Sequence, residues 1–205
     1  MLPANAAILC CPHCGGHKNV LQLMSGNTFG STRWSDAKQQ APMLPMVSYI
    51  QRCPHCGKYF FYTNEVRVGE AKEFSSDLGE LSYQHLKEAL DQLQPSGKDE
   101  TTTRLYLLWA FNDLYGNAEI ADIPTQEWEY HLANVQHLIP LMSDVLVQAE
   151  LYREIGEFQK CIELLNSMQI TPDLQNIKEM FLKESKRHNR KVFTLYGEAV
   201  RTAIT

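Results

Sequence analysis

The pattern of apolar and polar positions changes character near residue 77. Before that point, apolar residues form short runs or alternate with polar ones, which predicts short β-strands at residues 6–9, 20–23, 46–51 and 59–62. Beyond it, apolar residues recur every three to four positions, the period of an amphipathic α-helix. The pattern therefore predicts an α+β chain, with a small β domain at residues 1–75 and an all-α domain at residues 76–205.

The helical part is expected to begin with a run of leucines that share one helix face. Ser82 lies inside this run as an expected cap, and the Gln-Pro-Ser-Gly sequence at 94–97 ends it. A second helix is expected at 101–115, and a third between Thr125, its expected cap, and Pro140. The leucines of the first run are Leu78, Leu81, Leu86, Leu90 and Leu93.

The strongest helical signal spans residues 143–173. Gly156 is expected to turn the chain between two helices, and the small residues Ala149 and Cys161 would let those helices approach closely. This segment resembles one tetratricopeptide repeat, a helix-turn-helix unit of about 34 residues. Residues 101–142 resemble a poorer copy, and a capping helix is expected to begin near residue 173. The resemblance implies a tetratricopeptide-repeat-like helical bundle.

A bundle of this kind implies a groove for a peptide segment of a partner protein. Its expected lining consists of polar positions on the first helices of each pair, namely Asn112, Gln148 and Arg153. Cys161 is expected to be a buried small residue and not a nucleophile.

The cysteines carry the most specific signal in the chain. Five of the six lie within the first 56 residues, and four of these form a repeated tetrapeptide followed each time by glycine. A Cys-x-x-Cys spacing lets two sulfurs reach one tetrahedral metal ion at about 2.3 Å, and the second pair completes four-coordination. Proline presets φ in each turn, and glycine permits the positive φ that aims backbone N–H groups at the thiolates. The predicted metal ligands are Cys11, Cys14, Cys53 and Cys56.

The 38 residues between the two Cys-x-x-Cys pairs exceed the usual 15–20. Doubling a loop costs only about 0.6 kcal/mol of closure entropy. Structural zinc contributes roughly 10–16 kcal/mol in small peptides, so the long insert does not oppose a shared metal. Residues 25–45 are expected to be an ordered or semi-ordered loop, in which Trp34 either forms a binding surface or covers the face of the β domain.

The paired Cys-Pro-x-Cys-Gly turns resemble the knuckles of zinc ribbons and rubredoxins over residues 8–62. The resemblance implies two β-hairpins that share one metal ion, with Zn²⁺ favoured and Fe as the alternative. Cys10, His13, His17 or His55 replacing a ligand, a thioredoxin-like redox pair and a disulfide framework are the rival interpretations. Gly15-Gly16 disfavours a helix after the first pair, and the duplicated motif disfavours a single redox site.

Composition adds few constraints. The chain is 44% hydrophobic and 21% charged, as in ordinary globular proteins, and no run approaches 18 consecutive apolar residues. We find no secretory signal pattern, so a cytoplasmic location without membrane insertion is expected. Residues 1–70 hold six Lys and Arg against three Asp and Glu, whereas residues 71–205 hold thirteen against twenty-one. Neither part is basic enough to indicate nucleic-acid binding.

The sequence contains no nucleophile elbow, P-loop, dinucleotide-binding turn or His-Glu-x-x-His helix. Four thiolates would also saturate a zinc ion and leave no position for a catalytic water. The expected function is therefore a non-enzymatic, zinc-binding adaptor that recognises a protein or peptide partner. A rubredoxin-like iron electron carrier and a zinc-ribbon nucleic-acid adaptor are the alternatives, and the β domain is expected to need its metal in order to fold.

Overall fold

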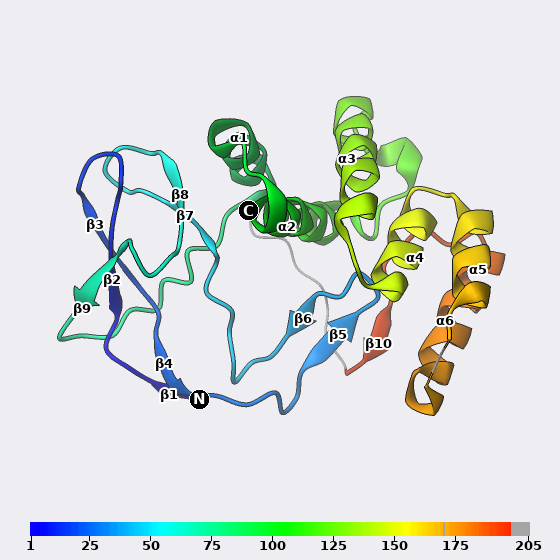
Figure 1. Ribbon diagram of the computed structural model, residues 1–205, viewed down its shortest axis with the longest axis horizontal. Helices are drawn as coiled ribbons and strands as arrows, with labels where there is room; N and C mark the ends of the chain where they lie inside the picture. Colours follow the sequence, from blue (N-terminus) through cyan, green and yellow to red (C-terminus); the bar gives the residue numbers. More distant parts are fainter. Residues whose placement is uncertain (170, 198–205) are drawn as a thin grey trace. The chain divides into compact units, whose positions relative to one another are not determined.

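A computed structural model describes residues 1–169 and 171–197 and confirms the α+β class (Figure 1). Among these residues the chain forms two compact units. The first comprises Met1–Ser31 and Gln40–Pro95, and the second comprises Thr32–Gln39 and the described residues from Ser96 onward. These units differ from the expected division at residues 75 and 76, because 32–39 lies with the helices and 76–95 with the strands. Which segments fold as independent domains stays a prediction.

Two antiparallel hairpins form the centre of the first unit. Strands β2 (Ala7–Cys10) and β3 (His17–Val20) pair in the register Ala7↔Val20 and Cys10↔His17, and β7 (Ile50–Arg52) pairs with β8 (Tyr59–Phe61). The predicted hairpins are therefore confirmed. The second strand begins at residue 17 instead of 20, because pairing resumes directly after the first Cys-x-x-Cys turn.

Further short strands extend the first unit beyond the two predicted hairpins. Strand β9 (Arg67–Glu70) pairs with the free edge of β2, and β1 (Leu2–Pro3) pairs with β4 (Leu23–Ser25). One buried cluster of this unit includes two cysteine side chains. Its members are Ala7, Leu9, Cys11, Val20, Cys53 and Phe60.

Helix α1 (Tyr83–Leu93) belongs to the first unit and packs against β8. The hydroxyl of Ser82 accepts a hydrogen bond from the backbone N–H of His85 at 3.3 Å, so the expected cap is confirmed. The hydroxyl of Tyr59, on β8, donates to the carboxylate of Glu88 at 2.6 Å. The leucine-rich run is helical only from residue 83, because its first residues lie in an extended segment before the cap.

The second unit contains five α-helices among its described residues. Helix α2 begins at residue 97, earlier than expected, and α3 begins at Thr125 with Pro124 as its cap, so the expected capping role of Thr125 is wrong. A 3₁₀ turn containing Pro140 follows α3, as expected. No described helix combines the length and the apolar character needed to cross a membrane. The helices are α2 (Gly97–Tyr115), α3 (Thr125–Leu138), α4 (Val145–Glu154), α5 (Phe158–Ser167) and α6 (Gln175–Lys186).

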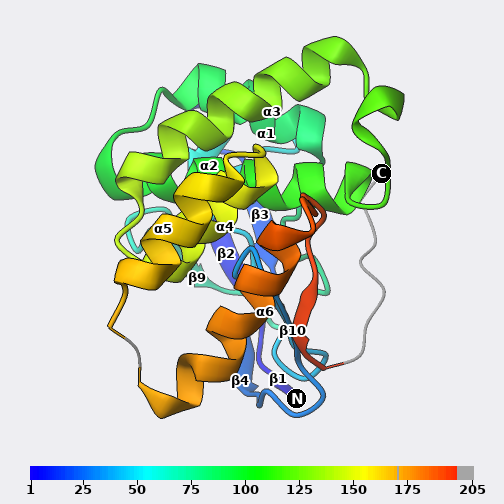
Figure 2. The ribbon, with the colours of Figure 1, turned by 90° about the vertical axis from the view of Figure 1, so that its right-hand side faces the viewer.

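Helices α4 and α5 form the predicted helix-turn-helix, with Gly156 at φ +85° in the turn (Figure 2). Ala149 and Cys161 are both fully buried, and they share a core cluster with Phe181 of α6. The close approach of α4 and α5 at small residues is therefore confirmed. Membership of the tetratricopeptide-repeat family stays a prediction, because a helix-turn-helix alone does not define it.

The expected peptide groove is wrong in its lining residues. Arg153 is completely buried, and Asn112 is only 6% exposed. The side-chain amide of the half-buried Gln148 donates to the backbone carbonyls of Met142 and Ile139. These polar side chains are therefore engaged in hydrogen bonds within the helical unit.

Residues 32–39 are a structural part of the helical unit. Strand β5 (Thr32–Trp34) pairs antiparallel with β10 (Thr194–Tyr196), and β6 (Gln39–Gln40) lies on its other edge (Figures 1 and 2). Trp34 is only 7% exposed there. Both expectations for Trp34, a binding surface or a cover for the β domain, are therefore wrong.

Buried hydrogen bonds explain why this segment lies among the helices. The carboxylate of Asp36 accepts from the side-chain amide of Asn112 at 3.0 Å, and its backbone carbonyl accepts from the indole N–H of Trp109 at 2.9 Å. The hydroxyl of Ser35 donates to the carboxylate of Glu150, which also forms a bidentate pair with Arg153 at 2.6 and 2.7 Å. A buried polar group is tolerated only with such partners, so these bonds specify the position of the segment.

Candidate metal centre

The four repeated cysteines converge in the first unit. The ligand atoms of Cys11, Cys14, Cys53 and Cys56 all lie within 4.8 Å of one another. Two pairs of sulfurs are measured across the two turns, Cys11–Cys56 at 3.8 Å and Cys14–Cys53 at 3.6 Å. A tetrahedron of four sulfurs around zinc has edges of about 3.8 Å when each Zn–S bond is about 2.3 Å. The sulfur spacing therefore fits a tetrahedral metal ion.

The two turns have the same backbone geometry. Gly15 and Gly57 both have φ +72°, a value that favours glycine over any residue with a Cβ. Their N–H groups donate to the carbonyls of Cys11 and Cys53 at 2.9 and 3.0 Å. These short-range bonds close each turn directly after a strand, so the first sulfur of each pair is fixed by the hairpin that carries it.

Backbone N–H groups also point at the sulfurs. The N–H of His13 donates to Sγ of Cys11, and the N–H of His55 donates to Sγ of Cys53, both at 3.4 Å. Such donors stabilise thiolate sulfur over thiol, as a metal ligand requires. The arrangement matches the role that the sequence assigned to proline and glycine in these turns.

The centre lies at the edge of the core. Cys11 and Cys53 are 2% and 1% exposed, whereas Cys14 and Cys56 are exposed. The first cysteine of each pair therefore contributes to the apolar core of the unit, and the second faces solvent. A metal ion bound here would connect the core to both turns.

The metal-free thiols influence one another's ionisation. Burial opposes ionisation of Cys53, but N–H donors from Cys56 and His55 and the neighbouring thiols lower its pKa to about 6. An N–H bond from Gly16 favours the thiolate of Cys14, yet the adjacent thiols outweigh it and raise the pKa of Cys14 to about 12. The N–H donors and the neighbouring thiols therefore favour the thiolate form most at Cys53. A divalent cation would displace the remaining protons.

The histidines of the tetrapeptides connect the two hairpins. Nε2 of His13 lies 3.0 Å from the carbonyl oxygen of Tyr59, the first residue of β8. Nε2 of His55 lies 3.1 Å from the carbonyl oxygen of His17, the first residue of β3. Each histidine therefore reaches from its own turn to the strand that follows the other turn. The sequence suggests these histidines only as possible replacement ligands, and nothing in it indicates this reciprocal pairing.

The remaining cysteines stand apart from the cluster. The thiol of Cys10 lies 3.7 Å from the carbonyl oxygen of Gly15, and Cys161 is buried in the second unit beside the hydroxyl of Ser185. All six cysteines are free thiols, so the disulfide framework is excluded for this structure. Burial raises the pKa of Cys161. This residue therefore has the inert character expected from the sequence.

The fold and the site together define an α+β protein with a four-cysteine candidate metal centre between two β-hairpins. No protein-family model, curated protein or solved structure matches this chain. The functional assignment therefore depends on the geometry described above.

Proposed function

We propose that Cys11, Cys14, Cys53 and Cys56 bind one Zn²⁺ ion as a structural centre, and that the protein is a non-enzymatic adaptor for a protein partner. The observation that carries the metal assignment is the convergence of four sulfurs within 4.8 Å from two identical turns. Four thiolates satisfy the preferred coordination number of zinc and leave no open position. When bound, the metal supplies a cross-link between the hairpins and neutralises the thiolate charge.

The composition of the core supports a structural role for the metal. One buried cluster of the first unit consists of six residues, and two of them are cysteines of the proposed site. A metal ion bound to these cysteines would therefore be attached directly to the apolar core. Because metal binding to such a unit is coupled to folding, the ion would provide much of its stability.

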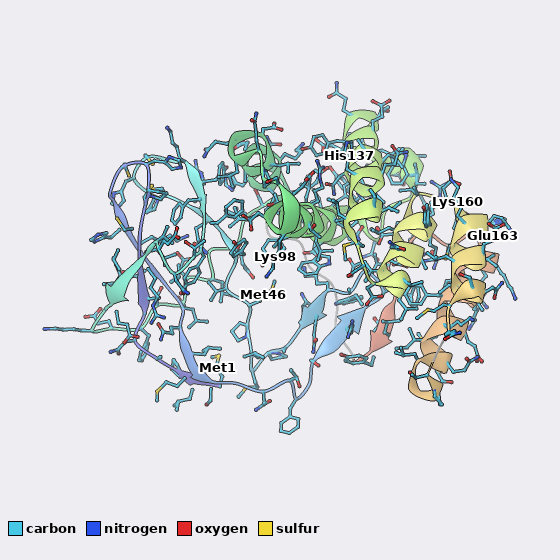
Figure 3. The ribbon with its side chains drawn as sticks, viewed as in Figure 1. Met1, Met46, Lys98, His137, Lys160 and Glu163 are labelled. Carbon is cyan, nitrogen blue, oxygen red and sulfur yellow. The ribbon has the colours of Figure 1, made fainter. Side chains whose placement is uncertain are left out.

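Exposed apolar side chains of the first unit support protein recognition. Met24 and Phe29 are 72% and 81% exposed, and Phe74 is 72% exposed. Met1 and Met46 are also exposed, and Figure 3 shows their side chains on this unit. Exposed apolar side chains mark a protein interaction surface where they adjoin one another, and flexible methionines adapt to varied partners.

Metal analysis tests the first half of the proposal. The protein purified without added metal should contain about one zinc per chain by elemental analysis. The Cys53→Ser variant should lose it, whereas Cys10→Ser, at a neighbouring cysteine outside the cluster, should retain it. A red, iron-containing preparation would instead favour the rubredoxin-like electron carrier. Zinc retained at full stoichiometry by Cys53→Ser would refute the ligand assignment.

Partner capture tests the second half. A partner recovered from cells with the wild-type chain should be lost with Phe29→Ser, which alters an exposed side chain without touching the proposed ligands. Leu141→Ser, at an exposed apolar position of the helical unit, serves as the matched control. Equal recovery of the partner with Phe29→Ser and wild type would show that this exposed apolar surface does not bind it. Recovery that depends on added nucleic acid would favour the nucleic-acid adaptor.

A further inference from the structure

The second unit contains a cavity of about 380 Å³ that the proposed metal function does not use. Its walls come from α2, α3, the end of α4 and the segment 187–192 that follows α6. This volume is within the range of small-molecule sites in proteins. The chemistry of its walls is of three kinds, each contributed by a different part of the unit.

One wall is aromatic. The ring of His131 stacks on Phe111 with a centroid distance of 3.7 Å and an interplanar angle of 11°. Trp128 lies 5.4 Å from His131, and Tyr115 lies 5.0 Å from Phe111. All four rings line the cavity. Such a wall favours a flat, conjugated group that can stack against it.

The inner end of the cavity is polar. Nδ1 of His131 and Oε1 of Glu154 have no hydrogen-bond partner among the residues that the structure describes, and both side chains are only 2% exposed. The other oxygen of Glu154, Oε2, accepts from the side-chain amide of Asn112 at 3.1 Å. Buried polar atoms without partners are rare, and each one requires an explanation. Here they mark two positions where a bound molecule would complete the hydrogen bonding.

Burial shifts the pKa of both inner groups towards the neutral form. Burial lowers the pKa of His131 to about 3. Burial and the neighbouring carboxylates of Glu150 and Asp36 raise the pKa of Glu154 well above its usual value. A neutral carboxyl group can donate through Oε1, and a neutral imidazole offers one donor or acceptor at Nδ1. The inner end therefore suits the uncharged polar edge of a heteroaromatic ring more than an ion.

The rim is cationic at Arg190. Its guanidinium lies 5.9 Å from the ring centre of Trp128 and 5.8 Å from that of Phe158. No carboxylate of the described residues forms an ion pair with it, whereas the rim residue Lys191 is paired with Glu119 at 2.6 Å. A Cβ at Gly156 would lie 2.2 Å from the guanidinium, so the glycine in the α4–α5 turn leaves space for Arg190. The unit thus places at the cavity a guanidinium group that has no carboxylate ion-pair partner among the described residues.

We propose that this cavity binds a small anion with a planar heteroaromatic ring, a class that nucleoside monophosphates represent. The ring would stack on the aromatic wall, its polar edge would meet His131 and Glu154, and the anionic group would pair with Arg190. A ring without an anionic group would leave Arg190 unused, and an anion without a ring would leave the aromatic wall and the polar inner end unused. The proposal is independent of the zinc assignment, because every residue involved belongs to the second unit.

Titration calorimetry on the full chain, as purified, tests this site, with AMP, GMP, CMP and UMP as probes. At least one should bind with 1:1 stoichiometry and a Kd below about 100 μM. Inorganic phosphate and the matching nucleoside, each carrying only part of the recognised chemistry, should bind at least tenfold more weakly. Saturable quenching of tryptophan fluorescence should accompany binding, because Trp128 lines the cavity.

Three variants locate the binding. His131→Phe keeps a stacked ring but removes both nitrogens, and Arg190→Gln removes the cation. Each should weaken nucleotide binding at least tenfold while circular dichroism stays that of the wild type. The control is Lys186→Gln, at an exposed position in the last turn of α6 and outside the cavity. This substitution should change the nucleotide affinity less than twofold.

Four results would overturn the proposal. They are no saturable binding of any monophosphate to the wild type, phosphate binding as tight as nucleotide binding, equal losses for Arg190→Gln and Lys186→Gln, or wild-type binding by a folded His131→Phe. If His131→Phe fails to fold, the affinity of Arg190→Gln alone tests the proposal. Arg190 lies at the rim of the cavity, so its replacement should leave the fold intact.

Discussion

The two units of this protein achieve their stability by different means. The first buries two cysteine side chains in one of its core clusters, and its four cysteine sulfurs lie close enough together to share a metal ion. The second packs fully buried aliphatic residues such as Leu108, Leu138 and Leu151, and it also buries charged groups among them. The first unit is therefore expected to respond to metal, and the second to changes in its buried charges. The predictions below test that contrast.

Metal removal should have the largest effect. Because structural zinc contributes roughly 10 kcal/mol or more, a strong chelator should unfold the first unit, including α1. The three tryptophans, Trp34, Trp109 and Trp128, all lie in the second unit, so tryptophan fluorescence should change little. Amide NMR signals of the first unit should collapse into the unfolded range at the same chelator concentration.

The placement of Trp34 determines what this experiment reports. Trp34 lies in the insert between the cysteine pairs, but it pairs with β10 in the helical unit, so its fluorescence follows the second unit. If chelation altered tryptophan fluorescence and the amide signals in one transition, the two units would fold as one cooperative body. The contrast between a first unit that depends on metal and a second unit that does not would then be wrong.

Breaking the buried ion pair should have the next largest effect. Arg153→Met removes the partner of Glu150 and leaves a carboxylate in a site where both side chains are fully buried. Loss of one member of a buried pair costs about 3–5 kcal/mol, which we expect as a decrease in the free energy of unfolding of the second unit. Urea denaturation followed by tryptophan fluorescence measures this value.

The same helical region provides a matched control. Lys160 and Glu157 form an exposed i,i+3 pair at 3.3 Å, and Figure 3 shows Lys160 on the surface of α5. Lys160→Met should therefore cost less than about 1 kcal/mol. Similar losses for Arg153→Met and Lys160→Met would show that burial of the charge network does not govern the stability of this unit.

The differences between expectation and structure have identifiable physical causes. The hairpins, the metal cluster and the α4–α5 pair follow from local rules, because turn residues and apolar periodicity act over a few positions. Asp36, His131 and Glu154 carry no local signal, since their importance arises from partners 23 to 76 residues away. The groove lining failed for the same reason: Arg153 looks like a surface residue until Glu150 and Asn189 are placed around it.

Acid should destabilise the second unit through His131. Its pKa is about 3 in the folded protein and about 6.5 when unfolded, so the unfolded state binds the extra proton between these values. The contribution of His131 to stability is therefore present above pH 6.5 and decreases as the pH falls, by about 2 kcal/mol between pH 7 and pH 5. The raised pKa of Glu154 acts in the opposite sense, so this contribution is measured as the difference in unfolding free energy between wild type and a His131 variant across this range.

A substitution isolates the contribution of this histidine. His131→Phe cannot take up the proton, so its stability relative to wild type should improve as the solution becomes more acidic. His137→Phe places the same substitution at an exposed position of α3 (Figure 3) and controls for the introduced ring. Parallel pH profiles for wild type and His131→Phe would contradict the assignment. Glu154, whose raised pKa gives a slope of the opposite sign, is unchanged in both variants.

The smallest predicted effect concerns the histidine bonds between the hairpins. A Cβ at Gly16 would lie 2.3 Å from Cδ2 of His55, so Gly16→Ala must displace the ring that reaches the carbonyl of His17. We expect Gly16→Ala to reduce the stability of the zinc-bound first unit by about 1 kcal/mol, the net contribution of one hydrogen bond. Chelator titration followed by the amide signals of this unit measures the change.

A double-mutant cycle separates this contact from backbone strain. In a His55→Ala background, Gly16→Ala should cost almost nothing, because no ring remains to be displaced. Gly15→Ala should cost about 1 kcal/mol in both backgrounds, since its φ of +72° disfavours any Cβ and nothing lies within 4 Å of the added atom. A Gly16→Ala cost that persists without His55 would show that the turn itself, and not the bond to the other hairpin, requires glycine there.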